Sequence, residues 1–214
     1  MLKIVLGNKK YSSWSLRPWL VLKQTGAPFE EVVVPLDMPD TAENIRRYSP
    51  SGRVPALIDG ALTVWDSLAI CEYLQEKFPQ QPLWPKDAAA RAHARSISSE
   101  MHSGFTNLRN DCAVKFLEQF PPGELRPETK SEIERIKAIW IECLRKYGGP
   151  FLFGSRFGIA DAMYAPVVSR FRTYSIPVEG PVKAYCEAIW DLPALQEWLK
   201  AARAEKLRAK FHEP

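Results

Sequence analysis

The stretch Arg53-Val54-Pro55-Ala56-Leu57-Ile58-Asp59-Gly60-Ala61-Leu62-Thr63-Val64-Trp65-Asp66-Ser67 contains the signals that decide the fold. Residues 54–58 and 62–65 are short apolar runs that predict two β-strands. The Asp59-Gly60 pair between them predicts a tight hairpin, because such a turn needs a positive φ, which glycine adopts readily. Pro55 is compatible with a strand because it stands at the strand's opening, where no ladder hydrogen bond is lost.

The segments on either side of this hairpin extend the pattern. A helix begins at Ser67, and one of its faces is apolar, with Leu68, Cys71, Leu74 and Phe78. Upstream, residues 2–6 predict a buried strand, residues 15–23 a helix that ends at Gly26, and residues 30–34 a β-branched strand. The order predicted for residues 1–78 is therefore β-α-β-(α)-β-β-α.

The remainder of the chain predicts helices only. A proline-rich segment, residues 78–85, interrupts the pattern and is interpreted as a linker. Helical periodicity then covers residues 87–120, 128–147, 159–173, 181–190 and 194–208, separated by proline and glycine clusters. The sequence thus predicts an α/β domain over residues 1–78, a linker over 79–87 and an all-helical domain over 88–214.

The composition is that of a globular protein able to bury a core. The 214 residues are 46% hydrophobic and 25% charged, with a net charge of +4 that lies entirely in residues 86–214. Much of the excess is in the final helix, at Lys200, Arg203, Lys206, Arg208 and Lys210. Such a run is typical of a solvated helix face, so no nucleic-acid partner is expected.

Cysteine and histidine usage argues against a metal site. The four cysteines have no CxxC spacing, and the only histidines, at positions 93, 102 and 212, supply few metal ligands. No leader segment is recognisable, and no apolar run approaches the ~20 residues of a membrane span. We therefore expect a reduced, cytoplasmic protein without a metal or a membrane partner.

Four short motifs carry a resemblance that covers essentially the whole chain. They are Ser12-Ser13-Trp14-Ser15-Leu16-Arg17, Arg53-Val54-Pro55-Ala56-Leu57, Asp66-Ser67-Leu68-Ala69-Ile70 and Gly158-Ile159-Ala160-Asp161. In this order and spacing they resemble the cytosolic glutathione transferases, and the serine motif is similar to that of the zeta class and its bacterial relatives. The resemblance implies a thioredoxin-like domain followed by a helical bundle, glutathione as co-substrate, and a homodimer.

The resemblance also implies how glutathione is held. Val54, before a cis Pro55, would offer its backbone N–H and C=O to the cysteinyl part, as an added strand would. Arg53 could reach the glycyl carboxylate, although a solvated surface arginine is the alternative. Ser67, at a helix N-terminus, would bind the γ-glutamyl carboxylate with Asp66 near the α-amine, and capping of the helix would explain Ser67 as well.

The serine motif is the predicted chemical centre. A free thiol with a pKa near 8.5 is only about 3% thiolate at pH 7, and lowering that pKa by about two units needs roughly 2.7 kcal/mol. A hydroxyl that donates to the sulfur at a helix N-terminus can supply much of this free energy. Ser12 is the first choice for this donor, Ser13 the second and Ser15 the third, and Ser15 best fits a plain helix cap.

The second substrate is expected to contact the helical domain. A mixed polar and aromatic stretch places His102, Phe105 and Arg109 in the wall that the family uses for this pocket, and Arg109 could instead form an ion pair. Arg170 or Arg172 could join Arg109 as a carboxylate clamp.

Five further positions are interpreted as structural. Arg17 is expected to form an ion pair across the domain boundary. Gly158 stands where the family usually has a capping Ser or Thr, so the helix that contains Asp161 should begin less stably by a few tenths of a kcal/mol. The tryptophans Trp140, Trp190 and Trp198 are expected in the core.

The predicted activity is activation of glutathione as a thiolate and its addition to a small electrophile, as in detoxification. A glutathione-dependent isomerase of maleylacetoacetate type, a glutathione peroxidase or reductase, and a non-enzymatic interaction protein of the same fold remain alternatives. Disulfide exchange by a protein thiol is not expected, because Trp14 rather than a cysteine stands in the helix-start motif.

Overall fold

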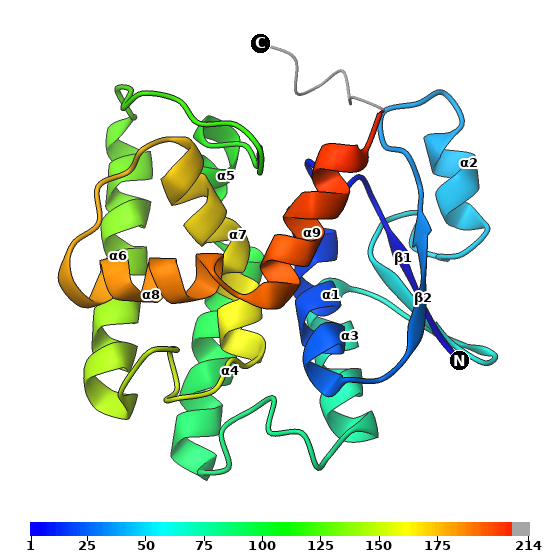
Figure 1. Ribbon diagram of the computed structural model, residues 1–214, viewed down its shortest axis with the longest axis horizontal. Helices are drawn as coiled ribbons and strands as arrows, with labels where there is room; N and C mark the ends of the chain where they lie inside the picture. Colours follow the sequence, from blue (N-terminus) through cyan, green and yellow to red (C-terminus); the bar gives the residue numbers. More distant parts are fainter. Residues whose placement is uncertain (207–214) are drawn as a thin grey trace.

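The first part of the chain forms a small mixed sheet with helices packed on it. The computed structural model describes residues 1–206. Its first seven elements are β1 Leu2–Leu6, α1 Ser13–Thr25, β2 Phe29–Val33, α2 Thr41–Arg46, β3 Ala56–Asp59, β4 Leu62–Val64 and α3 Ser67–Lys77. The strand order is β2-β1-β3-β4, with β1 and β2 parallel and side by side (Figure 1) and the other neighbours antiparallel. The predicted β-α-β-(α)-β-β-α order is confirmed.

The hairpin that decides the fold has the predicted turn. Asp59 pairs with Leu62 across the turn, and Gly60 has a φ of 61°. Gly26 ends α1 with a φ of 70°, as the sequence predicts. Both positions need the left-handed backbone that glycine adopts without steric cost.

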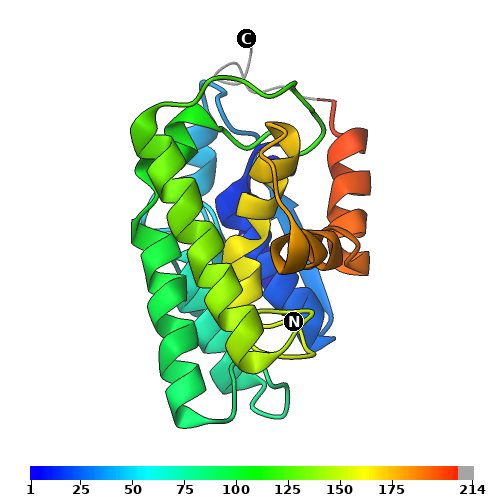
Figure 2. The same cartoon turned by 90° about the vertical axis from the view of Figure 1, so that its left-hand side faces the viewer.

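The second part of the chain is helical. Its elements are α4 Ala88–Ser103, α5 Thr106–Asp111, α6 Pro127–Tyr147, α7 Ile159–Thr173, α8 Gly180–Trp190 and α9 Pro193–Ala204. Helix α7 lies at the centre of this part (Figure 2), packs against both α1 and α4, and is buried along nearly its whole length. The predicted class, α/β followed by an all-α bundle, is confirmed.

The single helix predicted over residues 87–120 is wrong. Helix α4 ends at Ser103, and Phe105 has the left-handed φ of 57° that redirects the chain into α5. After Asp111 the chain follows an irregular path, in which Arg170 donates to the Cys112 carbonyl and Thr173 to the Lys115 carbonyl. These bonds satisfy the backbone without a helix, so apolar periodicity alone overestimated the helix length.

The junction between the two parts explains Gly158. A Cβ at this position would lie 2.7 Å from the carbonyl oxygen of Leu83, which belongs to the segment between α3 and α4. The same carbonyl accepts the free N–H of Ile159 at 2.9 Å, and Asp161 Oδ2 accepts the N–H of Gly158 at 2.9 Å. A backbone carbonyl therefore replaces the missing hydroxyl at the start of α7.

A distant segment anchors the loop between β1 and α1. Trp198 Nε1 donates to the Lys9 carbonyl at 2.8 Å, and the Glu205 carboxylate accepts the backbone N–H groups of Lys9 and Lys10 at 2.6 and 3.2 Å. The Lys9 side chain is buried over the Trp198 ring and pairs with Glu31 at 2.5 Å. This loop leads directly into the serine motif, so α9 and Glu205 help to fix that motif.

The predicted core tryptophans are largely confirmed. Trp140 and Trp198 are fully buried, whereas Trp190 is half-buried beneath Arg172. Helix α9 ends at Ala204, so the predicted 194–208 helix is too long, and Arg208, Lys210 and His212 lie outside the described residues. Within residues 1–206, no helix is both long enough and apolar enough to cross a membrane.

Candidate active site

The serine motif lies at the N-terminus of α1, where each hydroxyl has a different environment. Ser12 is the N-cap, since its Oγ accepts the Ser15 N–H at 3.3 Å. The Ser12 hydroxyl donates to Ser15 Oγ at 2.7 Å, and Ser15 Oγ also accepts the Gly7 N–H at 3.0 Å. The expectation that Ser15 is the cap is wrong, because its oxygen instead ties α1 to the end of β1. Within residues 1–206, no hydrogen bond is recorded for the Ser13 hydroxyl.

The Val54-Pro55 peptide bond is cis, as the resemblance implies. Antiparallel pairing of β3 with β1 starts at Ala56, so the half-buried Val54 lies just outside the ladder. In the described part of the chain, neither the N–H nor the C=O of Val54 forms a backbone hydrogen bond. The position leaves this backbone able to pair with an extended peptide. Arg53 beside it has an exposed side chain.

Asp66, and not Ser67, caps the N-terminus of α3. Asp66 is the N-cap and accepts the N–H groups of Leu68 and Ala69 at 3.0 and 3.3 Å. Ser67 is 0% exposed, and its Oγ has no hydrogen-bond partner among the described residues. The alternative that Ser67 is the cap is therefore wrong. A buried hydroxyl without a partner is unfavourable, and Ser67 differs from the equally buried Ser98 in lying at a helix N-terminus, where an anion would complete its hydrogen bonding.

Trp14 connects the serine motif to the helical part of the molecule. Its ring lies edge-on to His102 at 5.3 Å between centroids, and His102 Nε2 is 2.9 Å from Asp66 Oδ2. The guanidinium carbons of Arg17 and Arg109 lie 4.4 and 4.7 Å from the centroid of the Trp14 ring. The sequence prediction gave Trp14 no site role, although its place among three serines was a usable signal.

Of the two arginines beside Trp14, Arg17 is buried and Arg109 is half-buried, and neither forms an ion pair with a carboxylate within residues 1–206. Arg17 is 1% exposed and donates from Nε to the Met163 carbonyl at 3.1 Å, so it crosses to α7, but not through the predicted ion pair. Arg109 donates to the carbonyls of Met101 and His102. One nitrogen on each guanidinium, Arg17 Nη1 and Arg109 Nε, is buried with no partner in residues 1–206.

Burial and mutual repulsion perturb these arginines. Burial, then the charges of Arg109 and Arg170, lower the pKa of Arg17 well below its ordinary value. Burial also lowers the pKa of Arg109, and it lowers that of Arg170 to about 10 with a further contribution from Arg109. The three arginines act on one another electrostatically without an ion pair within residues 1–206, and the charge of Glu132 acts in the opposite direction on the pKa of Arg109.

Two predicted pocket residues lie elsewhere. The Phe105 ring is 7% exposed and belongs to the hydrophobic core. Arg172 stacks on Trp190 at 4.5 Å, and it is absent from the charges that act on Arg17. Arg170 is therefore the partner of Arg109 in the predicted pair of cations, and Arg172 is not.

The cysteines are poor candidates for chemistry. Burial raises the pKa of each thiol, to about 11 for Cys112 and about 12 for Cys143 and Cys186, and raises that of Cys71 as well. All four are free thiols. The described residues contain no cluster of three metal-ligating side chains.

Comparison with known proteins places this arrangement in a family. The family model "Glutathione S-transferase, N-terminal domain" matches residues 11–77, and "Glutathione S-transferase, C-terminal domain" matches residues 124–201. The chain belongs to the glutathione S-transferase family, as the sequence motifs predict.

The individual relatives include a probable isomerase and named glutathione transferases. A probable maleylacetoacetate isomerase of Caenorhabditis elegans is 30% identical over 85% of each chain. Glutathione S-transferase Z1 of Arabidopsis thaliana is 28% identical over 89% of this chain and 90% of its own length. A solved glutathione transferase homologue from Burkholderia gl BGR1, with bound glutathione, superposes with a TM-score of 0.73 at 25% identity, covering 95% of this chain and 99% of that one.

Proposed function

We propose that this protein binds glutathione between the N-termini of α1 and α3 and adds its thiolate to a small electrophile. The observation that carries the proposal is the buried, unpartnered hydroxyl of Ser67 at the start of α3. A γ-glutamyl carboxylate there would gain this hydrogen bond and the favourable end of the helix dipole. Val54 would pair with the cysteinyl backbone, and Arg53 is placed to approach the glycyl carboxylate.

Asp66 is proposed to bind the α-amine of glutathione, on the basis of the contacts that its carboxylate makes. Its carboxylate caps α3 and contacts His102, and its side chain is 55% exposed. It therefore has room to take a further cationic partner, and the α-amine of glutathione would be that partner. His102 would then be a positioning residue, which holds the carboxylate from the helical side.

Ser12 is proposed as the hydroxyl that serves the sulfur. Its proton can rotate from Ser15 Oγ to a thiolate, and Ser15 Oγ would still hold the Gly7 N–H. Its oxygen can meanwhile continue to cap α1. Ser13 is the alternative donor, since its hydroxyl forms no hydrogen bond within residues 1–206.

Titration of the bound thiol distinguishes the three serines. Thiolate absorbance near the ultraviolet edge is followed against pH, with glutathione bound, in Ser12→Ala, Ser13→Ala and Ser15→Ala. Losing the true donor should raise the pKa of the thiol by about one to two units. Ser12 is the wrong assignment if its variant titrates like the parent while Ser13→Ala does not. If all three titrate like the parent, the serine mechanism fails.

An acidic second substrate is supported by the arginine cluster. Arg17 and Arg109 lie over the ring of Trp14, the charge of Arg170 acts on Arg17, and none of the three forms an ion pair within residues 1–206. A diacid electrophile would neutralise this charge, which favours the glutathione-dependent isomerase as the second candidate function. Turnover of a maleyl-type diacid, compared with turnover of a neutral aryl halide under the same glutathione concentration, separates isomerase from general conjugation.

We also propose a cytoplasmic homodimer in which the α/β part, residues 1–78, provides the glutathione site. The side chains of Leu62 and Trp65 are 48% and 47% exposed beside β4, and such apolar surface is suited to a twofold contact. Light scattering should give about 49 kDa, twice the 24.3 kDa of the chain. A mass near that of one chain at micromolar concentration argues against the dimer.

A further inference from the structure

Helix α5, which carries Arg109, is too short to be stable by itself. It has six residues, Thr106–Asp111, and isolated helices shorter than about 12 residues are marginal in water. Its N-cap is Phe105, whose side chain has no oxygen that could accept a hydrogen bond from the first N–H groups. The support of α5 therefore has to come from other elements, and α5 packs against α6.

A carboxylate of α6 caps α5 in place of the missing side chain. Glu132 Oε2 accepts the backbone N–H of Leu108 at 2.7 Å, and Glu132 Oε1 accepts the backbone N–H of Asn107 at 3.3 Å. Glu132 Oε1 also accepts the side-chain amide of Asn107 at 2.9 Å. A carboxylate at a helix N-terminus satisfies free N–H groups and interacts favourably with the helix dipole. The half-buried Glu132 thus holds the first turn of α5, although it lies 24 residues beyond Leu108 in the chain.

A second set of contacts fixes the other end of α5. Asp111, the last residue of α5, accepts Arg126 Nε at 2.9 Å and Arg126 Nη2 at 2.6 Å. It also accepts the hydroxyl of the buried Thr129. Both partners belong to the start of α6, where Arg126 is the N-cap. Because α5 is attached to α6 at both ends, its position and its rotation about its own axis are restricted.

Arg109 is the side chain of α5 that this attachment holds beside the serine motif. Its guanidinium carbon lies 4.7 Å from the centroid of the Trp14 ring, and its Nη2 donates to two carbonyls in the last turn of α4. Its Nε is buried and has no partner within residues 1–206. Arg109 therefore faces the candidate active site, while its neighbours Asn107 and Leu108 attach the helix to α6.

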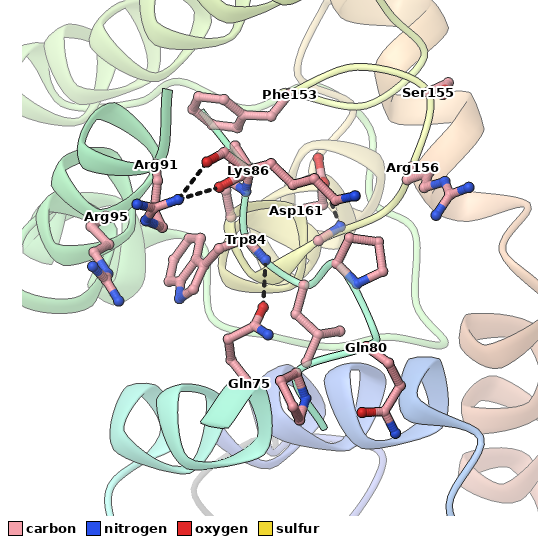
Figure 3. A pocket seen from close by; sticks show the side chains of 16 residues that line it. Gln75, Gln80, Trp84, Lys86, Arg91, Arg95, Phe153, Ser155, Arg156 and Asp161 are labelled. Carbon is pink, nitrogen blue, oxygen red and sulfur yellow. Dashed lines mark hydrogen bonds between the residues drawn. The ribbon is translucent and has the colours of Figure 1, made fainter. Parts of the chain in front are cut away.

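The attachment of α5 does not serve the cavity shown in Figure 3. That cavity, of about 720 Å³, lies between α3, the segment between α3 and α4, and the loop before α7 (Figure 3). Among the described residues that line it, none belongs to α5 or α6. The contact of α5 that bears on a functional site is therefore its contact with Trp14.

We propose that Glu132 is a positioning residue for the second substrate, because its cap on α5 holds Arg109 where the guanidinium can bind a carboxylate beside Trp14. This inference rests on the acidic second substrate proposed above and extends it to a residue of α6. The charge of Glu132 has a separate effect in the opposite direction. Burial lowers the pKa of Arg109 and the Glu132 charge counteracts this, but the same negative charge would repel an incoming anion. Removing the charge alone would thus favour a diacid, whereas removing the cap would disfavour it.

Competition by a diacid tests the role of Glu132. The probe is succinate, which has two carboxylates but no double bond to accept a thiol, used as an inhibitor of aryl-halide conjugation at saturating glutathione. Glu132→Gln removes the charge and one of the two carboxylate acceptors. The matched control Glu134→Gln removes the same charge at an exposed position of α6, where Glu134 pairs with Lys137 at 2.9 Å. Arg109→Gln reports whether the diacid uses Arg109.

The proposed role predicts the direction of each change. The inhibition constant of succinate, divided by the KM for the aryl halide, should rise about fivefold or more in Glu132→Gln, because a small displacement of Arg109 weakens its contact with a carboxylate. The ratio should stay at the parent value in Glu134→Gln. Asp111→Asn, which loosens the other end of α5, should raise the ratio as Glu132→Gln does. In an Arg109→Gln background, Glu132→Gln should have no further effect, since both changes act on one contact.

The remaining outcomes separate this inference from the proposed function. A ratio that is unchanged or lower in Glu132→Gln, or that rises equally with and without Arg109, overturns the positioning role. Arg109→Gln alone would then still report on the acidic substrate. If succinate does not inhibit the parent protein, the acidic site fails and the role of Glu132 fails with it, while the activation of glutathione as a thiolate is unaffected.

Discussion

Ser67→Ala should change stability and glutathione affinity in opposite directions. In the free protein the Ser67 hydroxyl is fully buried without a partner in the described residues, and such a group costs about 1–3 kcal/mol. Its removal should leave the free energy of unfolding unchanged or raise it by up to this amount. In the complex the hydroxyl donates to a carboxylate, which contributes about 1.5–3 kcal/mol. The dissociation constant of glutathione should therefore rise by about 10- to 100-fold.

Ser98 provides a matched control for this change. It is also 0% exposed, on α4, and its Oγ has no partner in the described chain. Ser98→Ala should have a similar effect on stability and none on glutathione affinity. Urea unfolding gives the free energy of unfolding for each variant, and calorimetry gives the dissociation constant.

The pair of variants makes the reasoning refutable. If Ser67→Ala destabilises the free protein by more than about 1 kcal/mol, the hydroxyl has a structural partner. If its glutathione affinity matches that of Ser98→Ala, the carboxylate is held elsewhere. The pKa of the bound thiol should stay the same in both variants, because the sulfur and the γ-glutamyl carboxylate lie at different ends of the tripeptide.

Three further perturbations probe the junction, the buried acid and the cation cluster. Gly158→Ser, although it restores the family's usual residue, should lower the free energy of unfolding by about 1–3 kcal/mol, because its Cβ would lie 2.7 Å from the Leu83 carbonyl; increased stability in urea unfolding would contradict this. Burial raises the pKa of Asp161 to about 7, so the folded state keeps a proton that the unfolded state loses near pH 4. Stability should accordingly fall as pH rises from about 4 to 7, and Asp161→Asn should abolish this slope in unfolding measured across that range. Arg109→Gln should raise KM for a diacid substrate about tenfold or more while KM for an aryl halide changes little, with Arg172→Gln as the control; equal effects on both substrates would remove Arg109 from the acidic pocket.

Local patterns predicted most of the fold because they depend on nearby residues. The hairpin at Asp59-Gly60 and the helix end at Gly26 follow from backbone preferences that the turn itself imposes. The irregular path after Asp111 was missed, since it depends on Arg170 and Thr173, more than 50 residues away, donating to the carbonyls of Cys112 and Lys115. Periodicity carries no information about such partners.

The same limit applies to the candidate site. The motifs indicated which segments meet, but not which side-chain oxygens already form hydrogen bonds within the protein. Asp66 rather than Ser67 caps α3, and Ser12 rather than Ser15 caps α1, and both outcomes depend on side-chain geometry over a single turn. The contacts of Trp14 with Arg109 require the packing of α5 against the start of α1, which no local pattern encodes.

The tie between Glu205 and the loop before Ser12 has a consequence for biosynthesis. The two segments are separated by 196 residues, so the bond from Lys9 N–H to Glu205 is among the last contacts available to a chain that emerges from the ribosome N-terminus first. The sheet and α1 can assemble earlier from residues already made. The loop between β1 and α1, however, is not held by Trp198 and Glu205 until α9 has been synthesised and has docked on α1. A nascent chain would thus hold a folded α/β part while the loop before Ser12 stays unfixed, so the serine motif reaches its final position only once the helical part is complete.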